Sequence, residues 1–247
     1  PAVDTLSNIA NLATQHFSTH PDQIGNNVLG LIKAVIDGNL VDAGLTEQAP
    51  AFVQRLSAIV QQLSWETLET ATGHRRAQWT ETAKLLAAAK RVVILVGNGV
   101  LRHPGGEGTT TNLLDLLILL GKLNQPGCGL GPLAEENNDQ GAVEMGAVPD
   151  FLPGPAPLND QASRDRLASL WREELPRTPG ITLTEMLAAA RTGSLKAMFM
   201  VGENPVGTLP AAAQAKEALA KLELLVCQEL FLTETAAMAH VVLPACS

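Results

Sequence analysis

Apolar residues in the first ninety positions recur every three or four residues, which is the spacing of an amphipathic helix. Val28, Leu31 and Val35 share one stripe in this way, and Gly38 follows where such a helix would end. The pattern predicts helices over residues 24–36, 51–63, 65–72 and 80–90. We therefore expect residues 1–90 to form a helical segment that opens a larger domain.

From residue 91 onward, short uninterrupted apolar runs replace the helical spacing. Such runs are typical of strands that are buried on both faces of a parallel sheet. They cover residues 92–96, 197–201, 222–227 and 241–243, and helical patterns separate them at residues 109–120, 182–191 and 211–222. The alternation predicts an α/β fold, with a Rossmann-like parallel sheet and flanking helices over residues 91–247. We expect the first three runs to be neighbouring strands of one sheet.

Residues 121–180 break both patterns and are predicted to form a long irregular segment. Gly127, Gly129 and Gly131 alternate there, and four prolines fall within residues 149–157. A loop of this length inside a compact domain usually binds a ligand or contacts a partner.

Composition and charge exclude several classes of protein. The chain has 247 residues, 46% of them hydrophobic, so a disordered chain is excluded. Lys and Arg number 17 against 25 Asp and Glu, for a net charge of −8, which argues against nucleic acid or an anionic membrane surface as a partner. The longest apolar run, residues 113–120, is far shorter than the roughly 20 residues that cross a bilayer.

The three cysteines, Cys128, Cys227 and Cys246, are too dispersed to form a disulfide framework or a metal site. We expect buried thiols in a reducing compartment, and we expect the isolated chain to bind no metal. The chain starts without Met and stops abruptly at Ser247, so we expect it to be a fragment of a longer subunit.

Ligands of open parallel sheets bind beyond the carboxyl ends of the strands, and three loops of this chain occupy that position. The candidate binding residues that follow the predicted strands are Gly97, Gly99, Gly202, Glu203, Asn204, Gln228 and Glu229. Glycine after a strand lets the backbone approach a ligand closely.

The pair Gly97 and Gly99 is equally well explained as a tight turn from strand to helix. Arg102 occupies the place of the third glycine in the dinucleotide-binding spacing, so the fingerprint is incomplete. His103 is the only histidine in one of these loops, and we expect a non-catalytic role for it. The chain also lacks a zinc-protease helix motif, a nucleophile elbow and a P-loop, so no catalytic residue is assigned.

Four segments, in the same order along the chain, carry a resemblance to a known family. Residues 202–205 read Gly-Glu-Asn-Pro, and residues 228–236 read Gln-Glu-Leu-Phe-Leu-Thr-Glu-Thr-Ala before the run 239–244. Residues 121–129 and 137–154 supply the other two motifs, which include Asn-Asn-Asp-Gln-Gly-Ala at 137–142. Together they resemble the large subunit of the molybdopterin oxidoreductase family, which includes formate dehydrogenases and the large peripheral-arm subunit of NADH-quinone oxidoreductase.

The resemblance implies a middle domain cut from a longer subunit. In the family an iron–sulfur and molybdenum-ligand region precedes this segment, and a barrel that binds the pterin dinucleotide follows it. The resemblance also adds Asn138 and Gln140 to the candidate cofactor-binding residues.

One departure from the family pattern changes the expected function. Formate dehydrogenases have Arg-Gly-Gln immediately before Asn-Asn, where this chain has Ala134, Glu135 and Glu136. No Lys or Arg occurs from residue 123 to residue 163, and like charges oppose the binding of an anionic pyrophosphate. The resemblance therefore predicts a scaffold domain of an NADH-quinone oxidoreductase subunit with a vestigial molybdopterin site and no cofactor in this segment.

The alternative is part of a working formate dehydrogenase catalytic subunit that holds molybdopterin guanine dinucleotide. In either case the resemblance implies an oxidoreductase whose partners are other subunits of a respiratory or formate dehydrogenase complex. The implied location is cytoplasmic, at the inner face of the membrane through partner subunits, without direct insertion.

Overall fold

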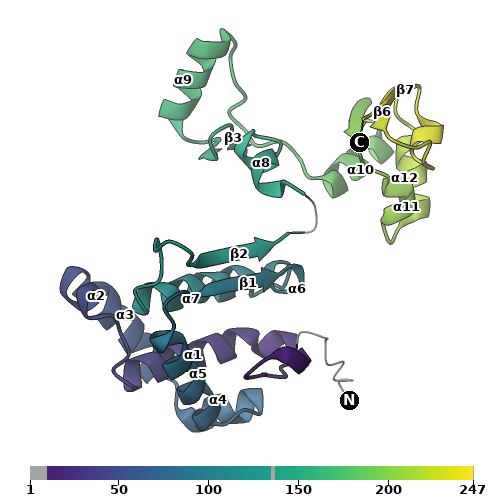
Figure 1. Cartoon of the computed structure of the whole chain (residues 1–247). Coiled ribbons are helices and arrows are strands. Elements are labelled where there is room, and N and C mark those ends of the chain that lie inside the picture. The colour runs from purple at the N-terminus through teal and green to yellow at the C-terminus, as the bar shows by residue number, and fades with distance from the viewer. Residues whose placement is uncertain (1–9, 135–136, 247) are drawn as a thin grey trace. The chain divides into compact units, whose positions relative to one another are not determined.

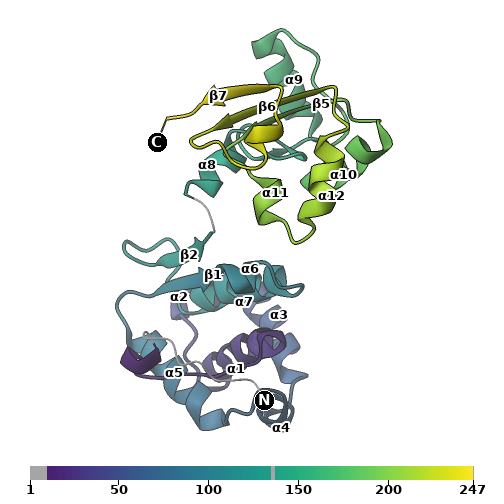
Figure 2. The ribbon, with the colours of Figure 1, turned by 90° about the vertical axis from the view of Figure 1, so that its right-hand side faces the viewer.

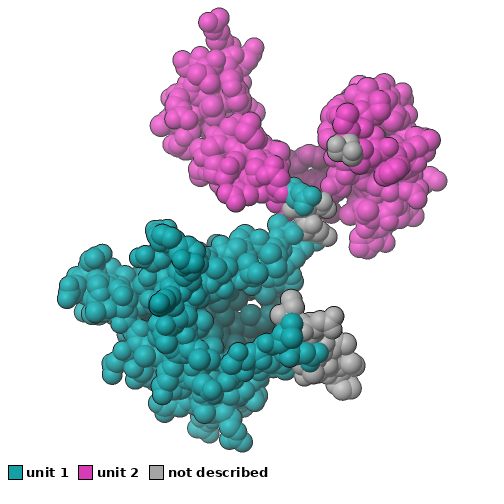
Figure 3. Space-filling model, in the orientation of Figure 1, with its two compact units in different colours: residues 1–137 teal, residues 138–247 magenta. Residues whose placement is uncertain are grey.

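The computed structural model describes residues 10–134 and 137–246, and the chain divides into two compact units (Figure 3). Unit 1 is Pro1–Asn137 and unit 2 is Asn138–Ser247. The predicted boundary at residue 90, between two segments of one domain, lies within unit 1. In the structure the helices before residue 90 and the first strand pair share unit 1, because helix α1 packs against helix α7 from beyond that point.

Helices form the first part of unit 1 (Figure 1). They are α1 (Ile24–Asp37), α2 (Ala43–Gln48), α3 (Pro50–Gln61), α4 (Trp65–Thr72) and α5 (Arg76–Ala88), with 3-10 turns at Ala10–Leu12 and Pro21–Gln23. Helix α1 contacts α3, α4, α5 and α7, and its buried stripe includes Ile32 and Val35. Trp79 of α5 is also fully buried in this core. The helical spacing of the sequence therefore marks the residues that form the core.

Unit 1 also holds a pair of parallel strands. β1 (Val93–Gly97) pairs with β2 (Gly129–Leu133), and helices α6 (Asn98–Leu101) and α7 (Gly106–Leu119) lie between them in the chain. The prediction that β1 would neighbour the runs 197–201 and 222–227 in one sheet is wrong, because β1 pairs with β2 instead. The sequence carries little signal for β2, since its run Gly-Leu-Gly-Pro-Leu lacks β-branched residues and Pro132 fits only an edge strand.

Unit 2 contains the three-stranded parallel sheet. β5 (Ala197–Val201), β6 (Leu224–Glu229) and β7 (Val241–Pro244) lie in that order, and the run 197–201 neighbours β6 as predicted. Helices α10 (Leu183–Thr192), α11 (Pro205–Thr208) and α12 (Ala212–Leu219) belong to the same region. Helices α10 and α12 lie on one side of the sheet, where Met198 and Leu225 are buried against them (Figure 2). Phe199 and Val201, on the opposite face of β5, are exposed.

The segment predicted to be irregular, residues 121–180, contains regular elements besides β2. They are α8 (Asp139–Glu144), the antiparallel pair β3 (Phe151–Leu152) and β4 (Ala156–Pro157), and α9 (Gln161–Trp171). The sequence signal for α9 is weak, because Leu167 is its only buried residue, although the Asp160 side chain caps its first turn.

Parallel sheets with flanking helices confirm the predicted α/β fold class. Among the described residues, no helix is both long enough and apolar enough to cross a membrane.

Candidate functional site

The loops that follow β5 and β6 meet at the carboxyl edge of the unit 2 sheet. The backbone N–H of Gly202 donates to the carbonyl oxygen of Gln228 at 2.9 Å. Gly202 has a φ of +65°, and nothing lies within 4 Å of the position that a Cβ would occupy. Glycine therefore serves two purposes there: it allows the left-handed turn, and it leaves the space beside the backbone open.

Asn204 ties the β5 loop to the loop that follows β6. Its Oδ1 accepts hydrogen bonds from the backbone N–H and the hydroxyl of Thr235, at 3.2 and 2.7 Å. Its Nδ2 donates to the Glu234 carboxylate at 2.8 Å. The Thr235 hydroxyl also accepts from the Val206 N–H at 3.2 Å, and Thr235 is fully buried. The two loops are thus joined by side-chain hydrogen bonds as well as by the backbone.

The edge carries carboxyl groups and no cation. Glu203 and Glu234 are exposed and Glu229 is half-buried, while residues 197–215 and 222–247 contain no Lys or Arg. The hydrogen bond from the Asn204 amide is the main reason that the pKa of Glu234 is lowered. An edge of this kind accepts hydrogen bonds from hydroxyl and N–H groups and repels phosphate.

Cys227 of β6 lies beneath this edge and is buried. Burial is the main cause that raises the pKa of its thiol, and the nearby Glu229 raises it further. The protonated thiol is a poor nucleophile, so the residue acts as a small apolar core side chain.

Gly97 and Gly99 lie in unit 1, at the end of β1 and in the short helix α6. No atom lies within 4 Å of a Cβ placed on either glycine, so both stand in open space. His103, in the same region, is bonded through Nε2 to Asp22 at 2.9 Å, and its Nδ1 accepts from the Gly105 N–H at 3.3 Å. These contacts tie the loop to the segment before α1 and supply a structural role for His103.

Asn138 and Gln140 lie at the start of α8 in unit 2. Asn138 has a φ of +64°, and Gly141 leaves room for its amide, because an added Cβ would overlap it. Gln140 donates to Glu144 at 2.8 Å within the same helix. Glu135 and Glu136, on which the vestigial-site prediction depends, lie outside the described residues.

The structure therefore brings together five of the nine candidate residues, those that follow β5 and end β6. These are Gly202, Glu203, Asn204, Gln228 and Glu229. Sequence reasoning missed Glu234 and Thr235 as members of the site. The sequence signal that could have identified them is the polar stretch Thr-Glu-Thr at residues 233–235, in the loop that follows β6.

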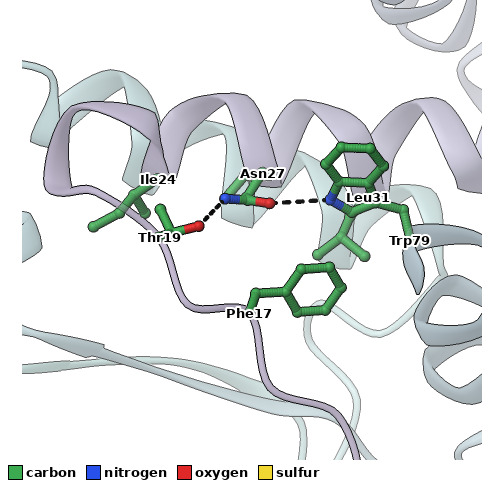
Figure 4. Close-up of a pocket in the computed structure, with 7 residues that line it drawn as sticks. Phe17, Thr19, Ile24, Asn27, Leu31 and Trp79 are labelled. Atoms are coloured by element: carbon green, nitrogen blue, oxygen red, sulfur yellow. Dashed lines mark hydrogen bonds between the residues drawn. The ribbon is translucent and has the colours of Figure 1, made fainter. Parts of the chain in front are cut away.

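Unit 1 also has a cavity of about 220 Å³, whose lining includes none of the candidate residues (Figure 4). Its lining is Phe17, Thr19, Ile24, Asn27, Val28, Leu31 and Trp79. The Asn27 amide donates to the Thr19 hydroxyl and accepts from Trp79 Nε1 at 3.2 Å. Because these polar atoms are already paired, the cavity offers a ligand little beyond apolar contact.

Within the part of the chain that the structure describes, no three His, Cys, Asp or Glu side chains are grouped so that they could hold a metal ion. That the isolated chain binds no metal stays a prediction, which elemental analysis of the purified protein would test.

Comparison with known proteins gives consistent matches over almost the whole chain. The chain is 33% identical over 222 residues to formate dehydrogenase H of Escherichia coli (strain K12), covering 90% of this chain and 31% of that protein. It is 31% identical over 224 residues to the F420-dependent formate dehydrogenase subunit alpha of Methanocaldococcus jannaschii, covering 90% and 33%. The chain thus spans about one third of the length of these relatives.

Among solved structures, acetylene hydratase from Pelobacter acetylenicus matches with a TM-score of 0.68 and 17% identity, covering 97% of this chain and 35% of that one. This likeness shows a shared fold. The two formate dehydrogenases favour the formate dehydrogenase alternative over the NADH-quinone oxidoreductase prediction. The family description "Molybdopterin oxidoreductase" matches residues 2–247, and the chain therefore belongs to the molybdopterin oxidoreductase family.

Proposed function

We propose that the chain is a section of a molybdopterin-dependent catalytic subunit of the formate dehydrogenase type. The observation that carries this proposal is the 33% identity to formate dehydrogenase H across 90% of the chain. The same relationship recurs with the subunit alpha of an F420-dependent formate dehydrogenase. On this proposal the complete polypeptide assembles with other subunits of a formate-oxidising complex.

The β5–β6 edge has the properties needed to hold the nucleoside end of a dinucleotide cofactor. Ribose hydroxyls and the N–H groups of guanine are hydrogen-bond donors, and the Glu203 and Glu229 carboxyl groups are acceptors. The open space beside Gly202 lets such a group approach the backbone. An acidic side chain near the end of a strand is also how dinucleotide-binding sheets hold a ribose.

The pyrophosphate does not suit this edge, because it would meet Glu203, Glu229 and Glu234 without a compensating cation. We therefore assign only the nucleoside end to these residues. The bound cofactor would supply redox chemistry at its metal, whereas the residues of this chain bind the cofactor and orient it.

The experiment uses the complete polypeptide that contains residues 1–247. We expect molybdenum or tungsten in the purified protein, together with formate-dependent reduction of a viologen dye. Absence of both metals, with no formate oxidation, would contradict the proposal.

A second experiment measures ligand binding at the β5–β6 edge alone, with guanosine as the probe because it carries no phosphate. Glu229→Ala should weaken guanosine binding in an NMR titration, because it removes an acceptor. Glu217→Ala is the matched control, since Glu217 is an exposed carboxylate on α12 that pairs with Lys221. Equal affinity of the two variants would argue against the assignment of the nucleoside end.

A second candidate function remains, and one observation favours it. Ala134, Glu135 and Glu136 stand where the formate dehydrogenase pattern has Arg-Gly-Gln. A scaffold domain of an NADH-quinone oxidoreductase subunit would tolerate this loss. Its signature in the same experiment is iron without molybdenum or tungsten, and no formate oxidation.

A further inference from the structure

We propose that Asn204 and Thr235 are positioning residues that hold the loops after β5 and β6 together as one rigid edge for the nucleoside end of the cofactor. This inference rests on the proposed function, since it deepens the account of the same site. On this view Asn204, which the sequence suggested as a binding residue, acts through Gly202 and Glu203, which precede it in the chain.

The hydrogen-bonding groups of the Asn204–Thr235 pair are occupied by protein partners. The Asn204 Oδ1 accepts both the N–H and the hydroxyl of Thr235. The Thr235 hydroxyl donates to that oxygen and accepts from the Val206 N–H. Because the pair is bonded in this way and Thr235 is fully buried, it has little left to offer a ligand directly.

The backbone of Asn204 also forms hydrogen bonds with the first turn of helix α11. Its carbonyl oxygen accepts the N–H groups of Gly207 and Thr208, both at 2.9 Å, and the Thr208 hydroxyl at 3.0 Å. Pro205, the first residue of α11, is fully buried. One residue therefore fixes the start of α11 through its backbone and the β6 loop through its side chain.

Gly207 shows how tightly the Asn204 amide is held. A Cβ on Gly207 would overlap the Asn204 Nδ2 and would lie 3.2 Å from the Glu234 carboxylate. Gly207 is not among the residues with positive φ, so the absence of a side chain there is required by the space and not by the backbone. Gly207→Ala should therefore displace the Asn204 amide from its hydrogen bonds without removing any polar group.

The first test measures amide hydrogen exchange in the chain. Thr235→Val keeps the shape of the side chain and removes the hydroxyl, whereas Thr235→Ser keeps the hydroxyl. We expect Thr235→Val to speed exchange about tenfold at residues 202–208 and 230–235, with strands β5 and β6 unchanged and with Thr235→Ser close to wild type. Gly207→Ala should act in the same direction as Val.

The matched control for this test is Thr111→Val, because the Thr111 hydroxyl donates to the Glu107 carbonyl within α7 of unit 1. It should leave the exchange of both loops unchanged. Loop exchange that does not rise in Thr235→Val, or a rise that the strands share equally, would overturn the positioning role.

The second test is calorimetric titration with guanosine, which carries no phosphate for the acidic edge to repel. We expect wild type and Thr235→Ser to bind with similar affinity and Thr235→Val to bind about tenfold more weakly. Absence of guanosine binding by wild type overturns the ligand part of the inference along with the nucleoside assignment in the proposed function. Equal binding by Thr235→Val, despite faster loop exchange, overturns the positioning role alone.

Discussion

At the scale of single residues, the proposed function depends on the charge of the loops at the β5–β6 edge. The Asn204 amide lowers the pKa of Glu234, so this carboxylate stays ionised down to a lower pH than a free glutamate. Its neighbours in the site, Glu203 and Glu229, are also acidic. The edge thus presents hydrogen-bond acceptors, which suit the donors of the proposed nucleoside, and its acidity disfavours phosphate in the same place.

The acidic pair at 135 and 136 leads to a prediction of the same kind. Glu135→Gly together with Glu136→Gln removes two like charges from a stretch without Lys or Arg. GDP should then bind more tightly by roughly 1–3 kcal/mol, because electrostatic repulsion of its phosphates is relieved. Calorimetric titration of both forms measures this, and weaker binding by the double variant would contradict the electrostatic argument.

Part of the site could be predicted from residues alone, because position after a strand is visible in the sequence. Gly202, Asn204 and Gln228 were identified in this way. Thr235 was not, since its contact with Asn204 spans 31 residues and depends on two loops folding onto each other. Gly97 was expected at the same edge, but it is the last residue of β1, which pairs with β2 in unit 1.

At the scale of elements, local capping explains why several helices begin where they do. Thr182 and Glu185 form a reciprocal capping box at the start of α10. Backbone and side-chain hydrogen bonds from Thr182 lower the pKa of Glu185. A lowered carboxyl pKa stabilises the fold above the pKa of the unfolded chain, and this contribution is lost as the pH falls through the folded-state value.

We therefore expect Thr182→Ala to destabilise the chain at pH 7 by about 1 kcal/mol, the usual effect of losing an N-cap. The difference from wild type should shrink as the pH falls below about 4. Urea unfolding at a series of pH values measures both effects. Thr111→Ala, at an exposed position in α7, is the control with little expected change, and a pH-independent difference for Thr182→Ala would refute the linkage.

Helix packing in unit 1 gives a second prediction at this scale. An added Cβ on Gly30 of α1 would lie 2.7 Å from the ring of the fully buried Trp79 of α5. Gly30→Ala should therefore destabilise unit 1 by about 1–3 kcal/mol, as overpacking does. Tryptophan fluorescence during urea unfolding reports the change.

The control for Gly30→Ala is Gly108→Ala in α7, where nothing lies within 4 Å of the added Cβ. This variant should be neutral or slightly more stable, because alanine favours helix over glycine. If Gly30→Ala proved as stable as Gly108→Ala, this result would contradict the close packing of α1 against Trp79.

Elements with a clear pattern of apolar residues could be predicted from the sequence, and elements without such a pattern could not. Helix α4 and strand β5 have the predicted bounds, and α1 differs by one residue at its end. Strand β2 was not predicted, because glycine and proline fill three of its five positions. Only its pairing with β1 identifies it as a strand. β6 begins two residues later than its apolar run, because Leu222 still belongs to the turn that follows α12.

At the scale of the whole molecule, the chain is about one third of the length of its formate dehydrogenase relatives. Each unit carries a parallel β pairing, with Gly97 as the last residue of β1 and Gly202 directly after β5. The family assignment is a property of the entire chain, since the match covers residues 2–247. The proposed activity and cofactor therefore concern the complete polypeptide, and we expect them to be measurable there.

The most direct test is nucleotide analysis of the complete polypeptide that contains this chain. Acid hydrolysis of the purified, desalted protein would break the pyrophosphate of a guanine dinucleotide and release GMP. We expect GMP in stoichiometric amounts, and a lower yield from the Thr235→Val variant than from Thr235→Ser. Protein that is folded and complete but releases no GMP would contradict the claim that this fold holds a nucleotide cofactor.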